Sequence, residues 1–171
     1  MLGLSLGGGA SLRCAIQHPD LVRRLVLVSA PHRRDAWLPE VRAGFDQMTR
    51  ATLFDVLSPS PMGEAWRAAA PDPDALPVLI DKTGELLRQP YDWSEEVRGL
   101  TMPVQLLYGD ADSIPPVQAA EFFALLGGGQ REPWPGGPLP SESRLAILPA
   151  TTHYSILEAP QLPAIIAGFL G

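Results

Sequence analysis

The chain has 171 residues, enough to enclose one substantial hydrophobic core. Hydrophobic residues make up 46% of it and charged residues 19%, which is ordinary for a soluble globular protein. The net charge of −6 gives no electrostatic reason to expect nucleic acid or an anionic membrane surface as a partner, so we expect neither.

The single cysteine, Cys14, excludes an internal disulfide and suits a reducing compartment, so a cytoplasmic location is expected. It falls on the apolar side of a predicted helix and is expected to be a buried structural thiol, because a reactive thiol needs exposure. Residues 1–10 are apolar but lack the basic start of a signal peptide, so export is not expected.

Three short apolar runs predict strands that are buried on both faces, as in the parallel sheet of an α/β protein: residues 25–30, 104–108 and 145–148. Each run is followed by a loop rich in Gly, Pro, Asp or Thr, and α/β proteins place their chemistry after the carboxyl ends of such strands. Right-handed crossovers favour neighbouring placement, so we expect the three strands in that spatial order.

Helical spacing of apolar residues predicts helices over 7–16, 117–126 and 161–170. The first is expected to place Ala10, Cys14 and Ile16 near one face, and the second Ala120, Phe123 and Leu126. Residues 31–100 hold further helical pieces separated by prolines, at 40–57, 63–70 and 76–87. A long insertion with helical spacing indicates a cap rather than a linker.

Residues 3–7 read Gly-Leu-Ser-Leu-Gly, which matches the G-x-S-x-G pattern. In that pattern the serine occupies a sharp turn from strand to helix, and the glycines allow neighbouring segments to approach. Ser5 is therefore a candidate nucleophile, and the backbone N–H of Leu6 is a candidate oxyanion donor. Taken alone, the pattern also fits a glycine-rich turn.

Candidate partners for Ser5 follow the second and third predicted strands. Asp110 and Asp112 lie in the turn after the second strand, where one carboxylate could orient an imidazole and the other cap the turn. His153 follows the third strand and completes the chain order Ser, Asp, His. Of the other histidines, His18 is expected to cap a helix end and His32 to lie in a solvated loop.

Four segments together resemble the α/β-hydrolase superfamily: GLSLGGG, QHPDLVRRLVLVSAP, GDADSIPP and LPATTHY. The resemblance implies the C-terminal part of an α/β-hydrolase fold, a parallel sheet with flanking helices. Residues 1–30 and 101–171 would form its core, with a helical cap or lid at 31–100. The family pattern of a glycine, an acid three residues on and a proline four after that favours Asp112 over Asp110.

The superfamily supplies about five strands before its nucleophile, whereas only Met1 and Leu2 precede Gly3 here. A second oxyanion donor would come from that upstream part. The first strand, 25–30, is expected to be an exposed edge. We therefore expect a truncated chain that is aggregated, homo-oligomeric or molten alone and becomes active with the upstream half.

The leading functional hypothesis is a serine hydrolase, with Ser5, His153 and Asp112 cleaving an ester, thioester or amide-type small molecule by acyl transfer. Carbon–carbon bond hydrolysis and perhydrolysis use the same triad, and a non-catalytic truncated paralogue or binding protein is the alternative. No metal or cofactor motif is present, so none is expected to be needed. Four residues are expected either to line an apolar acyl pocket or to pack within the cap: Trp37, Phe45, Met48 and Trp66.

Overall fold

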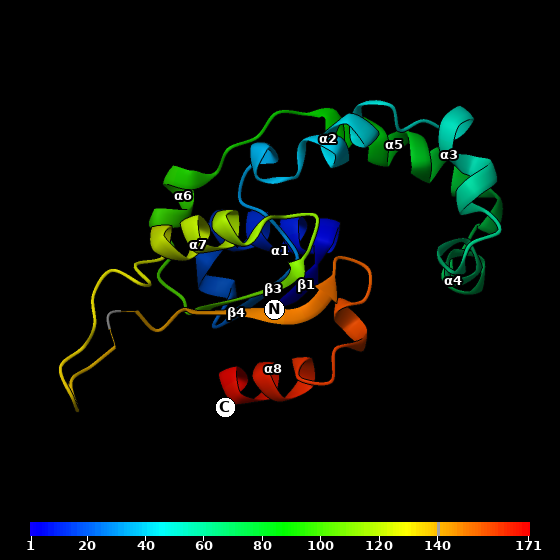
Figure 1. Cartoon of the computed structure of the whole chain (residues 1–171). Coiled ribbons are helices and arrows are strands. Elements are labelled where there is room, and N and C mark those ends of the chain that lie inside the picture. Colours follow the sequence, from blue (N-terminus) through cyan, green and yellow to red (C-terminus); the bar gives the residue numbers. More distant parts are fainter. Residues whose placement is uncertain (140) are drawn as a thin grey trace. The chain divides into compact units, whose positions relative to one another are not determined.

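The computed structural model of the chain describes residues 1–139 and 141–171 (Figure 1). These residues form two compact units. The sheet unit comprises residues 1–38 and 92–171, and the helical unit comprises residues 39–91. The helical unit is shorter than the expected cap at 31–100, because residues 31–38 and 92–100 make their contacts with the sheet unit.

The sheet unit is built on four parallel strands in the order β1-β2-β3-β4. They span β1 Leu2–Leu4, β2 Leu25–Val28, β3 Val104–Ala111 and β4 Arg144–Thr152. The predicted order of the last three strands is confirmed. The expectation that the strand at 25–30 is an edge is wrong, because β1 pairs with it in parallel, with Leu4 opposite Val28.

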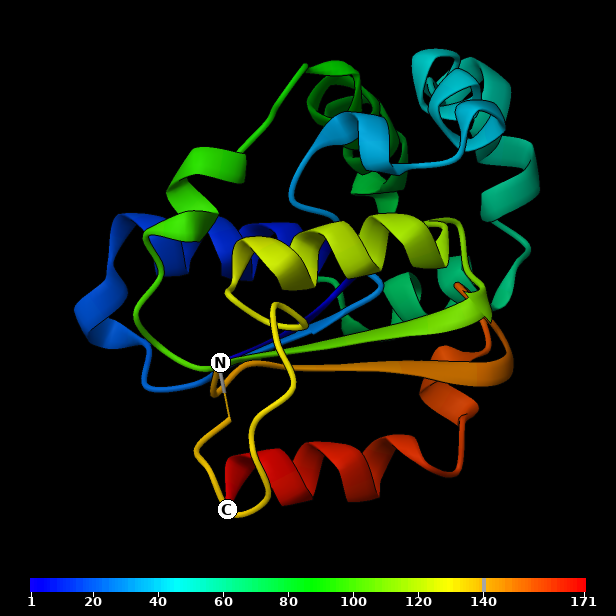
Figure 2. The same ribbon diagram turned by 60° about the vertical axis from the view of Figure 1, so that its left-hand side comes forward.

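Helices cover both faces of this sheet (Figure 2). One face carries α1 Ser5–Gln17 and α7 Pro116–Leu125, and the other carries α8 Leu162–Leu170. The strands β2 and β3 are buried on both faces over residues 25–28 and 104–109. On the α8 side the core joins strand residues to the C-terminal segment: Val26, Val28, Leu107, Leu148, Ile156, Leu162 and Phe169.

Two helices bury a different face from the one expected. In α1 the buried residues are Gly8, Leu12 and Ala15, whereas Ala10 is exposed and Cys14 is only half-buried. The prediction of a buried thiol is therefore wrong. In α7 the buried residues are Ala119 and Phe122 instead of the set beginning at Ala120. Both helices have apolar residues at neighbouring positions, so the spacing of apolar residues does not decide which face of the helix is buried.

The helical unit contains α2 Pro39–Asp46, α3 Arg50–Leu57, α4 Pro61–Ala69 and α5 Leu76–Arg88. The single helix expected over 40–57 is two helices. Thr49 caps the amino end of α3: its hydroxyl accepts the N–H of Thr52, and the Thr52 hydroxyl accepts the N–H of Thr49. An ion pair between Arg50 and Asp81 joins α3 to α5.

Short elements complete the described part of the chain. They are α6 Ser94–Arg98 and four 3₁₀ turns, η1 Pro19–Leu21, η2 Arg34–Ala36, η3 Pro73–Ala75 and η4 Ile156–Glu158. None of the helices in the described ranges is long and apolar enough to cross a membrane.

Candidate active site

Ser5, Asp112 and His153 form one hydrogen-bonded row within the sheet unit. His153 Nε2 lies 2.9 Å from Ser5 Oγ, and His153 Nδ1 lies 2.9 Å from Asp112 Oδ1. Ser5 follows β1, Asp112 follows β3 and His153 follows β4. Because the strands are parallel, their carboxyl ends share one edge of the sheet, and this brings together residues as far apart in sequence as 148 positions.

Ser5 occupies a strained turn. Its φ of 50° lies in the left-handed region, which costs a residue with a Cβ about 1–2 kcal/mol. A Cβ on Gly3 would clash with the carbonyl of Gly7, and one on Gly8 would clash with Ala30. Gly7 itself has open space around it. The close packing around this turn therefore requires glycine at residues 3 and 8.

Asp112 is held by donors on both carboxylate oxygens. Oδ2 accepts a 2.5 Å hydrogen bond from Ser29 Oγ and a 3.3 Å bond from the N–H of Gly109. Oδ1 accepts from the N–H of Ile114 at 3.3 Å and faces His153. Burial raises the pKa of Asp112, but the hydrogen bonds from His153 and Ser29 outweigh this and hold it below its usual value. A buried, ionised carboxylate therefore faces the imidazole.

Asp110 has a different partner. Its Oδ1 accepts the backbone N–H of Thr151 at 3.1 Å, and bonds from the N–H groups of Ala150 and Thr151 lower its pKa. A Cβ on Gly109 would clash with the carbonyl of Thr151, so glycine permits β3 and β4 to close up here. Asp110 thus fastens the end of β4 before His153, while Asp112 contacts the ring itself.

Comparison with known proteins finds relatives in sequence that are named as esterases. Over its whole length the chain is 27% identical to the pimeloyl-[acyl-carrier protein] methyl ester esterase of Aeromonas hydrophila, and covers 70% of it. It is 32% identical to the esterase of the same name from Citrobacter koseri, over 67% of the chain and 52% of the relative. No family model matches.

Solved structures of other proteins are similar to this chain in fold. A hydrolase from Pseudomonas aeruginosa superposes with a TM-score of 0.60 at 23% identity, covering 99% of this chain and 63% of that one. The enol-lactonase of Burkholderia xenovorans gives 0.60 at 21%, covering 99% and 64%. The chain therefore has the α/β-hydrolase fold. It spans between about half and 70% of the length of the relatives named here.

Within this fold the N–H of Leu6 lies in the first turn of α1, directly after Ser5. The first N–H groups of a helix have no acceptor within it, and the helix dipole favours negative charge there. The position therefore suits a developing oxyanion next to Ser5.

One of the four expected pocket residues lies beside the hydrogen-bonded row. The Trp37 ring meets the His153 ring edge-on, with centroids 5.4 Å apart, and Trp37 is buried. The following residue is fastened to the acid turn, since the N–H of Leu38 donates to the carbonyl of Ser113. The other three are partly exposed members of the helical unit: Phe45, Met48 and Trp66.

His32 is buried, so the expected solvated loop is wrong. Its ring packs against Phe122 with centroids 4.7 Å apart, and its carbonyl accepts the N–H of Trp93. Burial, followed by the charge of Arg33, lowers the pKa of His32 to about 4, although Asp92 opposes the shift. His32 is therefore a neutral core residue at neutral pH. His18 is exposed at the end of α1.

Sequence reasoning missed Ser29, the residue that donates to Asp112. The available signal was its place directly after β2, at the sheet edge where the other candidate residues gather. Among the described residues, no group of three or more His, Cys, Asp or Glu side chains could hold a metal ion.

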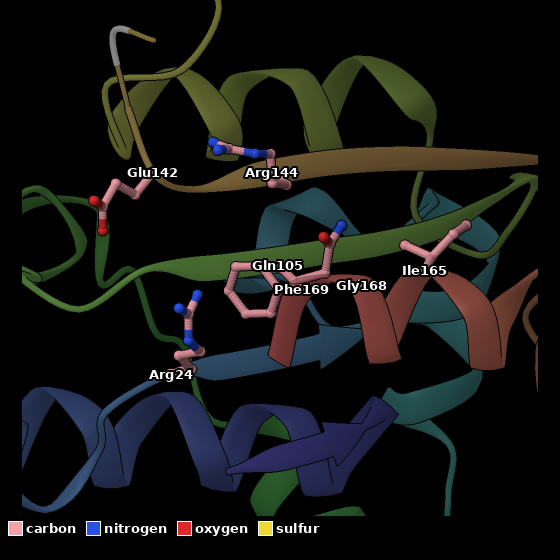
Figure 3. Close-up of a pocket in the computed structure, with 7 residues that line it drawn as sticks. All are labelled: Arg24, Gln105, Glu142, Arg144, Ile165, Gly168 and Phe169. Atoms are coloured by element: carbon pink, nitrogen blue, oxygen red, sulfur yellow. The ribbon is translucent and has the colours of Figure 1, made fainter. Parts of the chain in front are cut away.

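A cavity of about 370 Å³ lies at the other end of the strands (Figure 3). Arg24 precedes β2, Gln105 lies near the start of β3 and Arg144 begins β4, and the end of α8 covers them at Phe169. The Arg24 guanidinium stacks over the Phe169 ring, 5.4 Å from its centroid. This cavity is therefore separate from the row containing Ser5.

Proposed function

We propose that this α/β hydrolase cleaves an ester, thioester or amide by acyl transfer through Ser5, His153 and Asp112. The observation that supports it is the continuous row from Ser5 Oγ through both ring nitrogens of His153 to Asp112 Oδ1, with each step 2.9 Å long. A row of this kind joins a nucleophile to a base and the base to an orienting acid.

In the proposed reaction, Ser5 Oγ attacks the substrate carbonyl carbon and its proton passes to His153 Nε2. The tetrahedral intermediate collapses, the bond to the leaving group breaks, and Nε2 returns the proton to that group. Water then attacks the acyl-serine in the same way and releases the acid. Asp112 keeps the Nδ1 proton on its own side of the ring and stabilises the imidazolium.

The oxyanion that forms in both steps would be stabilised by the N–H of Leu6. A donor of this kind is worth about 10² to 10³ in rate. The positive end of α1 adds to it, because the helix begins at Ser5 itself.

Among the three bond types, an ester is the proposed substrate. The support is the similarity, across the whole chain, to a pimeloyl-[acyl-carrier protein] methyl ester esterase. Trp37, which packs on His153, is proposed to contact the acyl group. The roles of Phe45, Met48 and Trp66 in an acyl pocket remain predictions.

The test is a series of p-nitrophenyl esters of rising acyl length, with the matching anilides. We expect a burst of nitrophenol and an acyl adduct on Ser5, both lost in Ser5→Ala. Ser94→Ala is the matched control: Ser94 Oγ bonds Asp92 at 2.5 Å with no imidazole between them, so its loss leaves turnover unchanged. Turnover that survives Ser5→Ala would refute the proposal.

A further inference from the structure

We propose that Ser29 is a positioning residue of this site, whose hydroxyl holds the Asp112 carboxylate in the orientation that directs Oδ1 at His153. The catalytic consequence rests on the function proposed above. The geometric part, that Ser29 orients the Asp112–His153 contact, stands on hydrogen bonds within the sheet unit and can be measured separately.

The two oxygens of Asp112 have separate tasks. Oδ1 faces His153 Nδ1, while Oδ2 accepts the Ser29 hydroxyl at 2.5 Å. The two backbone N–H groups that also reach the carboxylate, those of Gly109 and Ile114, are both 3.3 Å away, beyond the usual 2.9–3.0 Å for such bonds. Ser29 therefore supplies the shortest and best-placed donor opposite the imidazole.

The carboxylate needs such a donor because its terminal torsion is soft. The χ2 angle of aspartate has a broad, twofold energy profile instead of three sharp wells, so packing alone restrains it weakly. Asp112 has a fully buried side chain, so water cannot replace a missing donor without entering the core. Without the Ser29 hydroxyl, Oδ2 would be left with one long backbone bond.

The backbone of Ser29 supports a role for its hydroxyl. Ser29 follows β2, its N–H donates to the carbonyl of Leu107, and its φ is 49°, in the left-handed region. Glycine adopts this conformation without strain, whereas a Cβ makes it unfavourable. The side chain is fully buried, and its hydroxyl donates to Asp112. That bond gives a reason for a serine where the backbone favours glycine.

The experiment compares Ser29→Ala, Ser29→Gly and Ser143→Ala. The first two both remove the hydroxyl, but alanine keeps the backbone strain and glycine relieves it, so their stabilities differ. Ser143 is the matched control, a buried serine whose hydroxyl accepts the N–H of Val104 at the amino end of β3. Its loss affects stability without touching Asp112.

The first measurement is the rate at which a fluorophosphonate modifies Ser5. Losing one hydrogen bond to a charged group should lower the rate of Ser5 modification by about tenfold or more in both Ser29 variants, irrespective of their stabilities. Ser143→Ala should react at the wild-type rate. Wild-type rates in the Ser29 variants, or rates that follow stability across all three variants, would overturn the proposal.

The second measurement does not depend on activity. The His153 Nδ1 proton, observed by NMR in ¹⁵N-histidine-labelled protein, reports its hydrogen bond to Asp112 directly. We expect this resonance to move upfield and exchange faster in both Ser29 variants and to be unchanged in Ser143→Ala. If wild-type Ser5 does not react with the phosphonate, the proposed function fails, yet this resonance still tests Ser29. An unchanged resonance in both variants would contradict the positioning role.

Discussion

Asp112 Oδ1 lies 2.9 Å from His153 Nδ1, although 41 residues separate them in sequence. Both residues come directly after the irregular part of the β3–β4 pairing, where the register shifts between Gly109 and Ala111. Such a bulge bends a strand and redirects the side chains beyond it. The shift therefore accompanies the change from Asp110, which bonds Thr151, to Asp112, which contacts the ring.

Asp112→Asn should slow phosphonate modification of Ser5 by about 10⁴, because an amide in this position stabilises the wrong tautomer of His153. Asp110→Asn is the matched variant. It weakens the bond to Thr151 but leaves the imidazole partner in place, so it should retain most of the rate. Second-order rate constants for both variants test this, and an Asp110→Asn chain that is the slower of the two would reverse the assignment.

Gly8→Ala should destabilise the sheet unit by about 1–3 kcal/mol, because the added methyl group clashes with Ala30 and overpacks the core. Gly9→Ala, one position on in the same helix, meets open space and should stabilise by about 0.5–1 kcal/mol. Urea unfolding followed by circular dichroism measures both changes. Equal effects of the two substitutions would show that Gly8 does not lie against Ala30 as described.

His32 should make the chain less stable as the pH falls. The pKa of His32 is 6.5 in the unfolded chain and about 4 in the folded one. Between these pH values the unfolded state binds a proton that the folded state does not, so acid favours unfolding. The free energy of unfolding should therefore decrease by at most about 3 kcal/mol from pH 7 to 4 through this group. His32→Asn, which does not titrate, should show a shallower pH dependence in urea titrations. Parallel curves would argue against a buried neutral imidazole.

The sequence was sufficient to predict the elements with strong signals. Apolar runs flanked by turns located β2, β3 and β4. The G-x-S-x-G pattern and the chain order of serine, aspartate and histidine made Ser5 and His153 candidates, and the resemblance to the α/β-hydrolase superfamily favoured Asp112 over Asp110. The apolar runs are a local signal, and the candidate residues come together because the carboxyl ends of parallel strands meet at one edge of the sheet.

Other features depend on tertiary contacts that the sequence pattern does not encode. β1 has three residues, too few for a periodic signal, and its pairing with β2 makes it a strand. His32 is polar and follows a proline, yet it is buried against Phe122. Ser29 contacts Asp112 across 83 residues, through a left-handed backbone conformation that serine rarely adopts.

The most direct test of the account is to treat the chain with a fluorophosphonate and locate the adduct by peptide mass spectrometry. A nucleophile activated by His153 and Asp112 should give one adduct, on the peptide containing Ser5, which is absent from Ser5→Ala and strongly reduced in His153→Gln. Ser94, paired directly to Asp92, should remain unmodified. A chain that unfolds cooperatively but leaves Ser5 unmodified, or that reacts equally at Ser94, would contradict the account.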